Sequence, residues 1–154
     1  MAILFCTNKI LKELGLSKNK VPSLAHSESP LENWYINLFY QDRKKCLIFV
    51  QAESLFTFIV PNVLRKDIVL IHELLGRELS RAMYHEDFKA DEIQKVTGIL
   101  ADLTVSQTQN RQVLGSMNNL IFQYSVYQDA YRAQLLPPSA VNLYHLPRST
   151  FTTL

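Results

Sequence analysis

The chain has 154 residues, which favours one domain over residues 1–154 with a core of its own. Hydrophobic residues make up 47% of the chain and charged residues 19%, proportions that are ordinary for a soluble globular protein. The formal net charge of +2 is too small to indicate binding to nucleic acid or to an anionic membrane by itself.

Several features favour a cytoplasmic protein without a membrane anchor. No apolar run approaches the roughly 20 residues that a spanning helix needs, and residues 1–9 lack a basic leader and a signal-peptide core. Cys6 and Cys46 both fall within expected strands, and their spacing matches no ligand motif. We therefore expect two reduced cysteines in the core and no disulfide.

The first thirty residues predict a strand, a short helix and a loop. Ile3–Cys6 is an apolar run of strand length, and Thr7 suits the N-cap of a helix over Asn8–Leu14. Gly15 suits the left-handed position that follows a last helical turn. Ser17–Pro30 has no hydrophobic period, so we expect a surface loop, and the sequence does not decide whether it is ordered.

The segment Leu31–Pro61 predicts a three-strand antiparallel meander. Gln41–Lys44 is a polar interruption of hairpin length. The runs Cys46–Val50 and Leu55–Val60 are apolar on both faces, so helices are expected on both sides of the sheet. The first strand alternates with period 2, with Trp34, Ile36, Leu38 and Tyr40 on one side and Tyr35, Asn37 and Phe39 on the other.

The second half of the chain predicts two long helices. Helical periodicity indicates one helix over Lys66–Tyr84 and a short one over Asp91–Leu100. Leu103–Ser106 reads as a strand, and Thr108 as the N-cap of a second long helix over 109–131. The expected fold class is α+β, with a mainly antiparallel sheet of about four or five strands and two long helices packed on it.

The start of the second long helix suggests an anion or nucleotide site, enzymatic or not, over Thr108–Asn119. Arg111 in the first turn, together with unpaired backbone N–H groups, would hold the anion. Gly115 would leave space for the ligand, since a helical glycine costs about 1 kcal/mol against alanine. Asn110, Ser116 and Asn118 complete the candidate set. The alternative is tight packing on the sheet, with Arg111 paired to a buried carboxylate or carbonyl.

The hairpin suggests another function, nucleic-acid binding. Arg43, Lys44 and Lys45 lie close in sequence to Trp34 and three other aromatic residues, a combination similar to a stacking platform for single strands. The alternative is a solvated hairpin tip beside core aromatics. The neighbouring aromatic residues are Tyr35, Phe39 and Tyr40.

Catalytic and cofactor motifs are absent from the sequence. It contains no phosphate-binding glycine loop, no HExxH, no CxxC and no GxSxG, and its four histidines lack metal-ligand spacing. We therefore expect no metal and no cofactor, and an enzymatic activity is undecided but disfavoured. The leading hypothesis is a non-enzymatic binding or regulatory module that recognises a protein partner or a second copy of itself.

A family resemblance covers nearly the whole chain. The segments CTNKILKEL, NWYINLFYQDRKKCLIFV, TQNRQVLGSMNN and NLYHLPRS resemble a bacterial family of unknown function, the one catalogued as 6933. The resemblance implies a small single-domain bacterial protein. It implies no activity, cofactor or catalytic residue, because fold-level likeness does not supply chemistry.

Overall fold

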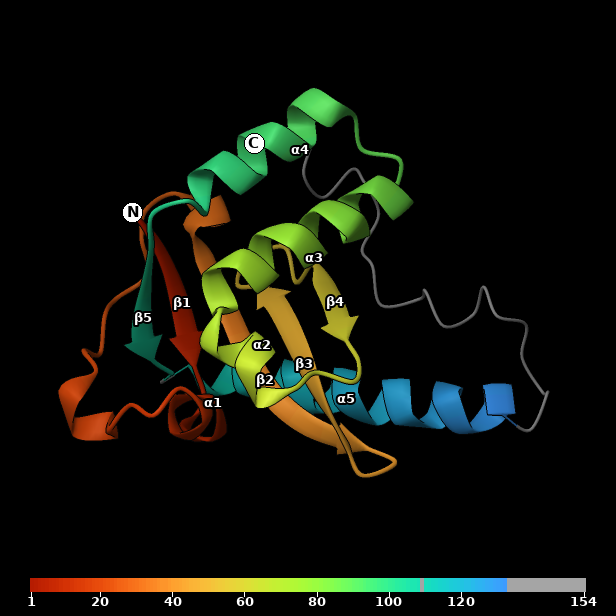
Figure 1. The fold of residues 1–154 in the computed structure, drawn as a ribbon. Helices are drawn as coiled ribbons and strands as arrows, with labels where there is room; N and C mark the ends of the chain where they lie inside the picture. The colour runs from red at the N-terminus through yellow and green to blue at the C-terminus, as the bar shows by residue number, and fades with distance from the viewer. Residues whose placement is uncertain (109, 133–154) are drawn as a thin grey trace.

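A computed structural model describes residues 1–108 and 110–132 and shows one mixed sheet between two helical layers (Figure 1). The strands of this α+β fold are β1 (Ala2–Cys6), β2 (Asn33–Gln41), β3 (Lys44–Gln51), β4 (Thr57–Val60) and β5 (Leu103–Gln107). The helices are α1 (Asn8–Glu13), α2 (Arg65–Val69), α3 (Ile71–His85), α4 (Ala90–Ile99) and α5 (Arg111–Arg132). Two short 3-10 turns are η1 (Lys18–Lys20) and η2 (Pro30–Glu32). No helix in the described ranges is long and apolar enough to cross a membrane.

The sheet has five strands in the order β4-β3-β2-β1-β5, within the expected number. Strands β2, β3 and β4 form the antiparallel meander that the sequence predicts. Strand β1, however, pairs in parallel with both β2 and β5. The expectation of a mainly antiparallel sheet was therefore wrong. Connections that contain helices precede β2 and β5 and return the chain to the end of the sheet at which β1 begins. Strands that start at the same end of a sheet pair in parallel.

The β2–β3 hairpin closes through Asp42 and Arg43, and both residues have positive φ, 54° and 66°. Such values are required at both central positions of a type I′ turn, the two-residue turn that fits the twist of paired strands. Gln41 pairs with Lys44 directly across the turn. The hairpin thus presents Arg43 at its tip.

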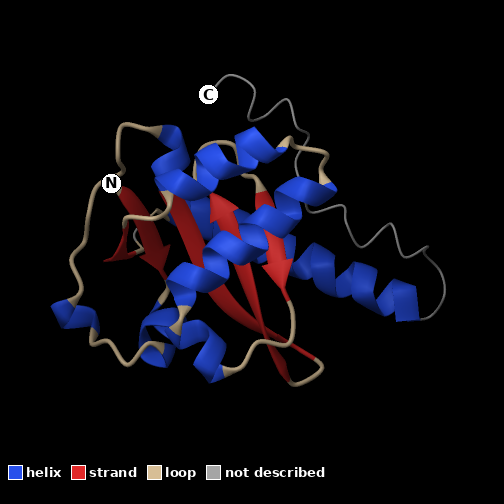
Figure 2. Cartoon of the chain, turned by 45° about the horizontal axis from the view of Figure 1, so that its top comes forward, coloured by secondary structure: helices blue, strands red, loops and turns tan. Residues whose placement is uncertain are grey.

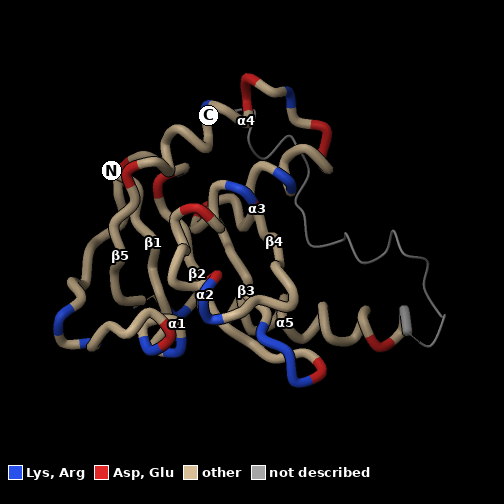
Figure 3. Tube along the Cα trace, viewed as in Figure 1, with Lys and Arg blue, Asp and Glu red and all other residues tan. Residues whose placement is uncertain are grey.

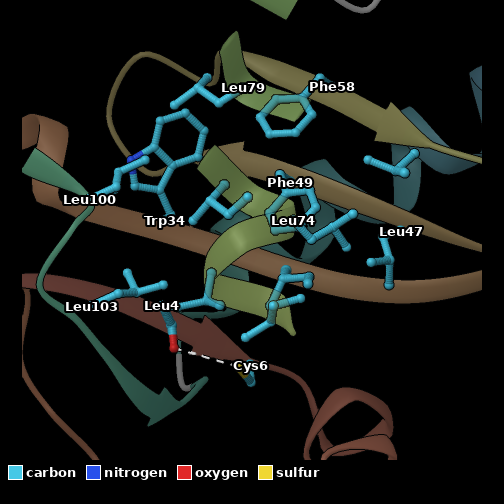
Figure 4. Packing of buried hydrophobic residues seen from close by; sticks show 14 of the residues in the cluster. Leu4, Cys6, Trp34, Leu47, Phe49, Phe58, Leu74, Leu79, Leu100 and Leu103 are labelled. Atoms are coloured by element: carbon cyan, nitrogen blue, oxygen red, sulfur yellow. Dashed lines mark hydrogen bonds between the residues drawn. The ribbon is translucent and has the colours of Figure 1, made fainter. Parts of the chain in front are cut away.

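Helices cover both faces of the sheet, as the two-sided apolar strands require (Figure 2). One face packs against α1, α2, α3 and α4 and carries Trp34, Ile36 and Leu38 (Figure 4). The other face packs against α5 and carries Tyr35 and Phe39. The alternation expected along the first meander strand is confirmed. On the α5 side the core includes Val113, Met117 and Tyr124.

The expected helix over Lys66–Tyr84 is two helices, α2 and α3, which meet at Leu70. Leu70 has φ −96° and ψ 41°, outside the helical range, so one turn is interrupted there. The start of α2 is capped by Asp67, whose carboxylate accepts a hydrogen bond from the backbone N–H of Leu64 at 2.9 Å. Ile68 and Ile71 are both buried, so the apolar stripe continues across the break and periodicity alone misses it.

The loop expected over Ser17–Pro30 is held against the sheet edge. The backbone N–H of Gln107 donates to the carbonyl of Pro22 at 2.9 Å, and the N–H of Leu24 donates to Oγ of Ser106 at 2.9 Å. The loop therefore covers part of the outer edge of β5, which would otherwise expose unpaired strand groups.

Candidate functional site

The start of α5 is capped by Asn110, not by Thr108 as expected. Oδ1 of Asn110 accepts hydrogen bonds from the backbone N–H groups of Gln112 at 3.0 Å and Val113 at 3.2 Å. Both Thr and Asn favour this position, and the helix begins at Arg111, so the residue directly before it serves as the cap. Two N–H groups that an anion would need are thus already bonded within the chain.

Asn110 also lies beside a partly buried polar cluster that the sequence did not reveal. Its side chain lies near the hydroxyl of Tyr35, and Nε2 of His26 lies 2.6 Å from the same hydroxyl. Tyr35 is buried and stacks on Phe5 with ring centroids 4.7 Å apart. Burial raises the pKa of Tyr35 to about 12, and the side chain of Asn110 acts to lower it. The contact between His26 and Tyr35 ties the Ser17–Pro30 loop to β2.

The other residues of the expected anion site lie on α5 but do not converge at a strand end. Arg111, Gly115 and Asn118 are exposed on the side of α5 away from the sheet, and Ser116 is half-buried. Among the described residues, no atom lies within 4 Å of the position that a Cβ of Gly115 would take, so the space beside this glycine is open. The alternative for Arg111, a buried partner, was wrong because its side chain is exposed.

The hairpin cations, in contrast, belong to a larger basic surface. Lys45 lies beside α1 and α2, and a cavity of about 390 Å³ opens between these elements. The cavity is lined by Lys9, Lys12, Glu13, Leu38, Tyr40, Lys45 and Arg65. A second cavity, of about 450 Å³, is lined by Arg43, Lys44, Lys45, Asn62, Val63, Leu64 and Arg65.

The two cavities share Lys45 and Arg65, so they adjoin, and we call them together the basic groove. Figure 3 shows these cations gathered around α1, α2 and the hairpin tip. Six cationic side chains and one carboxylate line the basic groove, on a chain whose total formal charge is only +2. The remainder of the chain is therefore net acidic, and positive charge is concentrated at this end of the sheet.

One carboxylate organises the centre of the basic groove. Oε1 of Glu13 lies 2.8 Å from Nζ of Lys45, and Oε2 lies 4.0 Å from Nε of Arg65. Within the part of the chain that the structure describes, Lys9, Lys12, Arg43 and Lys44 form no ion pair within 4.0 Å. Their charges are thus available to an anion from solution.

Of the aromatic residues near the hairpin, Tyr40 alone faces the basic groove. It is 57% exposed and lies opposite Lys45 across the β2–β3 pair. Trp34, expected as part of the surface, is fully buried, and its Nε1–H donates to the carbonyl of Leu31 at 2.9 Å. Trp34 therefore stabilises the core and contacts no external ligand. Tyr35 and Phe39 are buried on the opposite face of the sheet.

Other chemistry-bearing residues take structural positions. Cys6 and Cys46 are buried free thiols, as expected, and burial raises the pKa of Cys6 to about 12, which disfavours a reactive thiolate. Nε2 of His72 lies 3.1 Å from the carbonyl of Leu103 and so links α3 to β5. Over residues 1–108 and 110–132, no cluster of three or more His, Cys, Asp or Glu side chains is arranged to hold a metal ion.

Residues 3–148 match a protein family described as a domain of unknown function (DUF6933). No curated protein and no solved structure matches the chain.

Proposed function

The chain belongs to the DUF6933 family, whose description assigns no activity, and we propose that it binds nucleic acid through the basic groove. The observation that carries the proposal is the accumulation of six cations around two adjoining cavities. When these side chains bind the phosphate groups of a nucleic acid, they displace the counterions that are condensed on it. The release of those counterions drives binding.

The basic groove combines charge with an aromatic face. Proteins that bind single strands use a positive groove along the backbone and exposed aromatic rings on which bases stack, each worth about 1–3 kcal/mol. Tyr40 is half-exposed between Lys45 and the α1 lysines and is suited to this role. We therefore propose single-stranded nucleic acid as the ligand class.

The backbone conformation at the hairpin tip also supports nucleic-acid binding. A non-glycine residue at positive φ is disfavoured, and glycine is the preferred second residue of a type I′ turn. Arg43 occupies that position with φ 66°. Strained positions of this kind concentrate at functional sites, and a guanidinium at the tip suits phosphate recognition.

The two other hypotheses from the sequence fit this groove less well. Cores of protein interfaces are depleted in charged residues, whereas charged side chains dominate the basic groove. An anion site at the α5 start would compete with Asn110, whose side chain already bonds two of the N–H groups. Recognition of a protein partner is better supported on a different surface, where Phe122 and Val126 of α5 are exposed.

We also propose that the role is non-enzymatic and cytoplasmic. The described residues bring together no nucleophile with a base beside it in the basic groove. Two buried free cysteines suit a reducing compartment.

The test is fluorescence anisotropy with a labelled single-stranded oligonucleotide of mixed sequence at low salt. We expect wild-type protein to bind and the double variant Lys12→Glu, Lys44→Glu to lose affinity by about tenfold or more, because two phosphate contacts become repulsive. The double variant Lys20→Glu, Lys95→Glu changes two exposed cations outside the basic groove and serves as the charge-matched control. Equal losses in the double variant and the control, or no binding by wild type, would contradict the proposal.

A further inference from the structure

Glu13 places a carboxylate in a groove that otherwise concentrates positive charge. It lines the cavity of about 390 Å³ together with Lys9, Lys12, Lys45 and Arg65. It is also the last residue of α1, where an anion is unfavourable with the helix dipole. A groove that only attracted phosphate groups would bind them more tightly without this negative charge. Attraction of phosphate therefore does not account for Glu13.

The ion pair with Lys45 uses only part of the hydrogen-bonding capacity of this carboxylate. Oε1 of Glu13 lies 2.8 Å from Nζ of Lys45, and this contact joins α1 to β3. Oε2 lies 4.0 Å from Nε of Arg65, which is beyond hydrogen-bond distance. A carboxylate can accept about four hydrogen bonds, and the side chain of Glu13 is 17% exposed. Glu13 can therefore accept donors from a ligand in the cavity while it keeps its contact with Lys45.

The ring of Tyr40 is suited to hold a base beside this carboxylate. Tyr40 and Lys45 are cross-strand partners on β2 and β3, and the side chains of such partners project from the same face of a sheet. Both residues line the cavity that Glu13 lines, and Tyr40 is 57% exposed. Stacking tolerates any sequence because every base has a π face, so Tyr40 does not distinguish between bases. Any preference comes from the polar groups that meet the edge of the stacked base.

The polar groups around Glu13 are complementary to guanine. The Watson–Crick edge of guanine carries two adjacent donors, N1–H and N2–H₂, next to the acceptor O6. The two oxygens of a carboxylate can accept from both donors at once, whereas adenine and cytosine each offer one amino group and thymine one ring N–H. The ammonium of Lys45 has three donors and directs one of them to Glu13, so a donor remains beside the carboxylate for O6.

We propose that Glu13 selects guanine in a single strand bound to the basic groove. This inference rests on the proposed nucleic-acid binding and adds the base that the groove prefers. The guanine ring stacks on Tyr40, its N1–H and N2–H₂ donate to Glu13, and its O6 accepts from Lys45. Lys9 and Lys12 are exposed and three residues apart, hence on one side of α1, where they bind the neighbouring phosphates.

The experiment compares oligonucleotides by fluorescence anisotropy of the full chain at one low salt concentration. A labelled oligothymidylate is the reference, and its central base is replaced in turn by guanine, adenine, cytosine or hypoxanthine. We expect guanine to tighten binding by about tenfold, within the range of bidentate base contacts, and adenine and cytosine to tighten it less. Hypoxanthine keeps N1–H and O6 but lacks the N2 amino group, so its affinity should fall between those of guanine and thymine.

Glu13→Gln tests the carboxylate, because the amide keeps the shape of the side chain but replaces one acceptor by a donor. This variant should lose the preference for guanine and should bind oligothymidylate more tightly, since the groove loses a negative charge. Glu78→Gln is the matched control. Glu78 is a helical carboxylate of similar exposure, 15%, which lies 3.0 Å from Nη1 of Arg81 outside the basic groove, and its replacement should keep the preference.

The outcomes separate this inference from nucleic-acid binding itself. Wild-type protein that binds every strand with the same affinity would overturn the selection of guanine and leave binding at the basic groove in place. A role of Glu13 in structure alone would lower the melting temperature of Glu13→Gln and leave its preference for guanine intact, which would overturn the assignment to Glu13. Absence of binding to every strand would overturn both proposals.

Discussion

Replacing Arg43 by glycine should make the protein more stable and a weaker binder. Arg43 has φ 66°, a left-handed conformation that costs an L-residue roughly 1–2 kcal/mol. Glycine removes this strain but loses more entropy on folding, about 0.5–1 kcal/mol. The net gain is about 0.5–1 kcal/mol, and a domain of this size gains about 2–4 °C in melting temperature per kcal/mol.

Arg43→Ala is the matched control, because it removes the same charge and keeps the left-handed strain. Differential scanning fluorimetry should show Arg43→Gly melting above both wild type and Arg43→Ala. Anisotropy at low salt should show both variants binding the oligonucleotide more weakly, and to the same extent. A glycine variant that melts with or below the alanine variant would refute the strain argument. Unchanged affinity in both variants would show that the hairpin tip does not contact the ligand.

Two further predictions concern the core. Gln51 is 1% exposed, its Nε2–H₂ donates to the carbonyl of Pro30, and its Oε1 accepts from the N–H of Ser54 at 2.7 Å. Because both backbone groups lose their partner, Gln51→Leu should lower the free energy of unfolding, measured in urea, by about 2–4 kcal/mol. An effect as small as that of the exposed Gln94→Leu would contradict this. The pKa of Tyr35 is raised to about 12, above its unfolded value of about 10, so its neutral form contributes stability that is complete below pH 10 and lost as the pH rises toward 12. Tyr35→Phe should therefore lose less of its free energy of unfolding at alkaline pH than wild type does, as measured by denaturation at several pH values. Identical pH profiles for the two proteins would contradict the raised pKa of Tyr35.

The meander was predictable because its signals are local. Alternation along β2 assigns Trp34 and Tyr35 to opposite faces, and the short polar turn at 41–44 specifies antiparallel pairing. The parallel pairing of β1 with β2 and β5 was not predictable in this way. It depends on the path of the helical connections and on contacts between residues about 30 and 100 positions apart, such as Leu4 with Trp34 and with Val105.

The candidate site was likewise predictable only where its residues are close together in the sequence. The cluster Arg43–Lys45 is contiguous, so the sequence reveals it directly. The basic groove exists only because α1 and α2 bring Lys9, Lys12 and Arg65 to the same hairpin, which no local pattern encodes. At the α5 start, Thr108 and Asn110 are both good capping residues, and the geometry of the turn selects one of them.

The dependence of oligonucleotide affinity on salt tests nucleic-acid binding at the basic groove most directly. If the groove neutralises about four phosphates, the logarithm of the binding constant should fall with the logarithm of salt concentration with a slope of about −3, since a single strand contributes about −0.7 per contact. The double variant Lys12→Glu, Lys44→Glu should show a slope that is less steep by about 1.4. Wild-type binding that is absent at low salt, or that does not change with salt, would contradict the account.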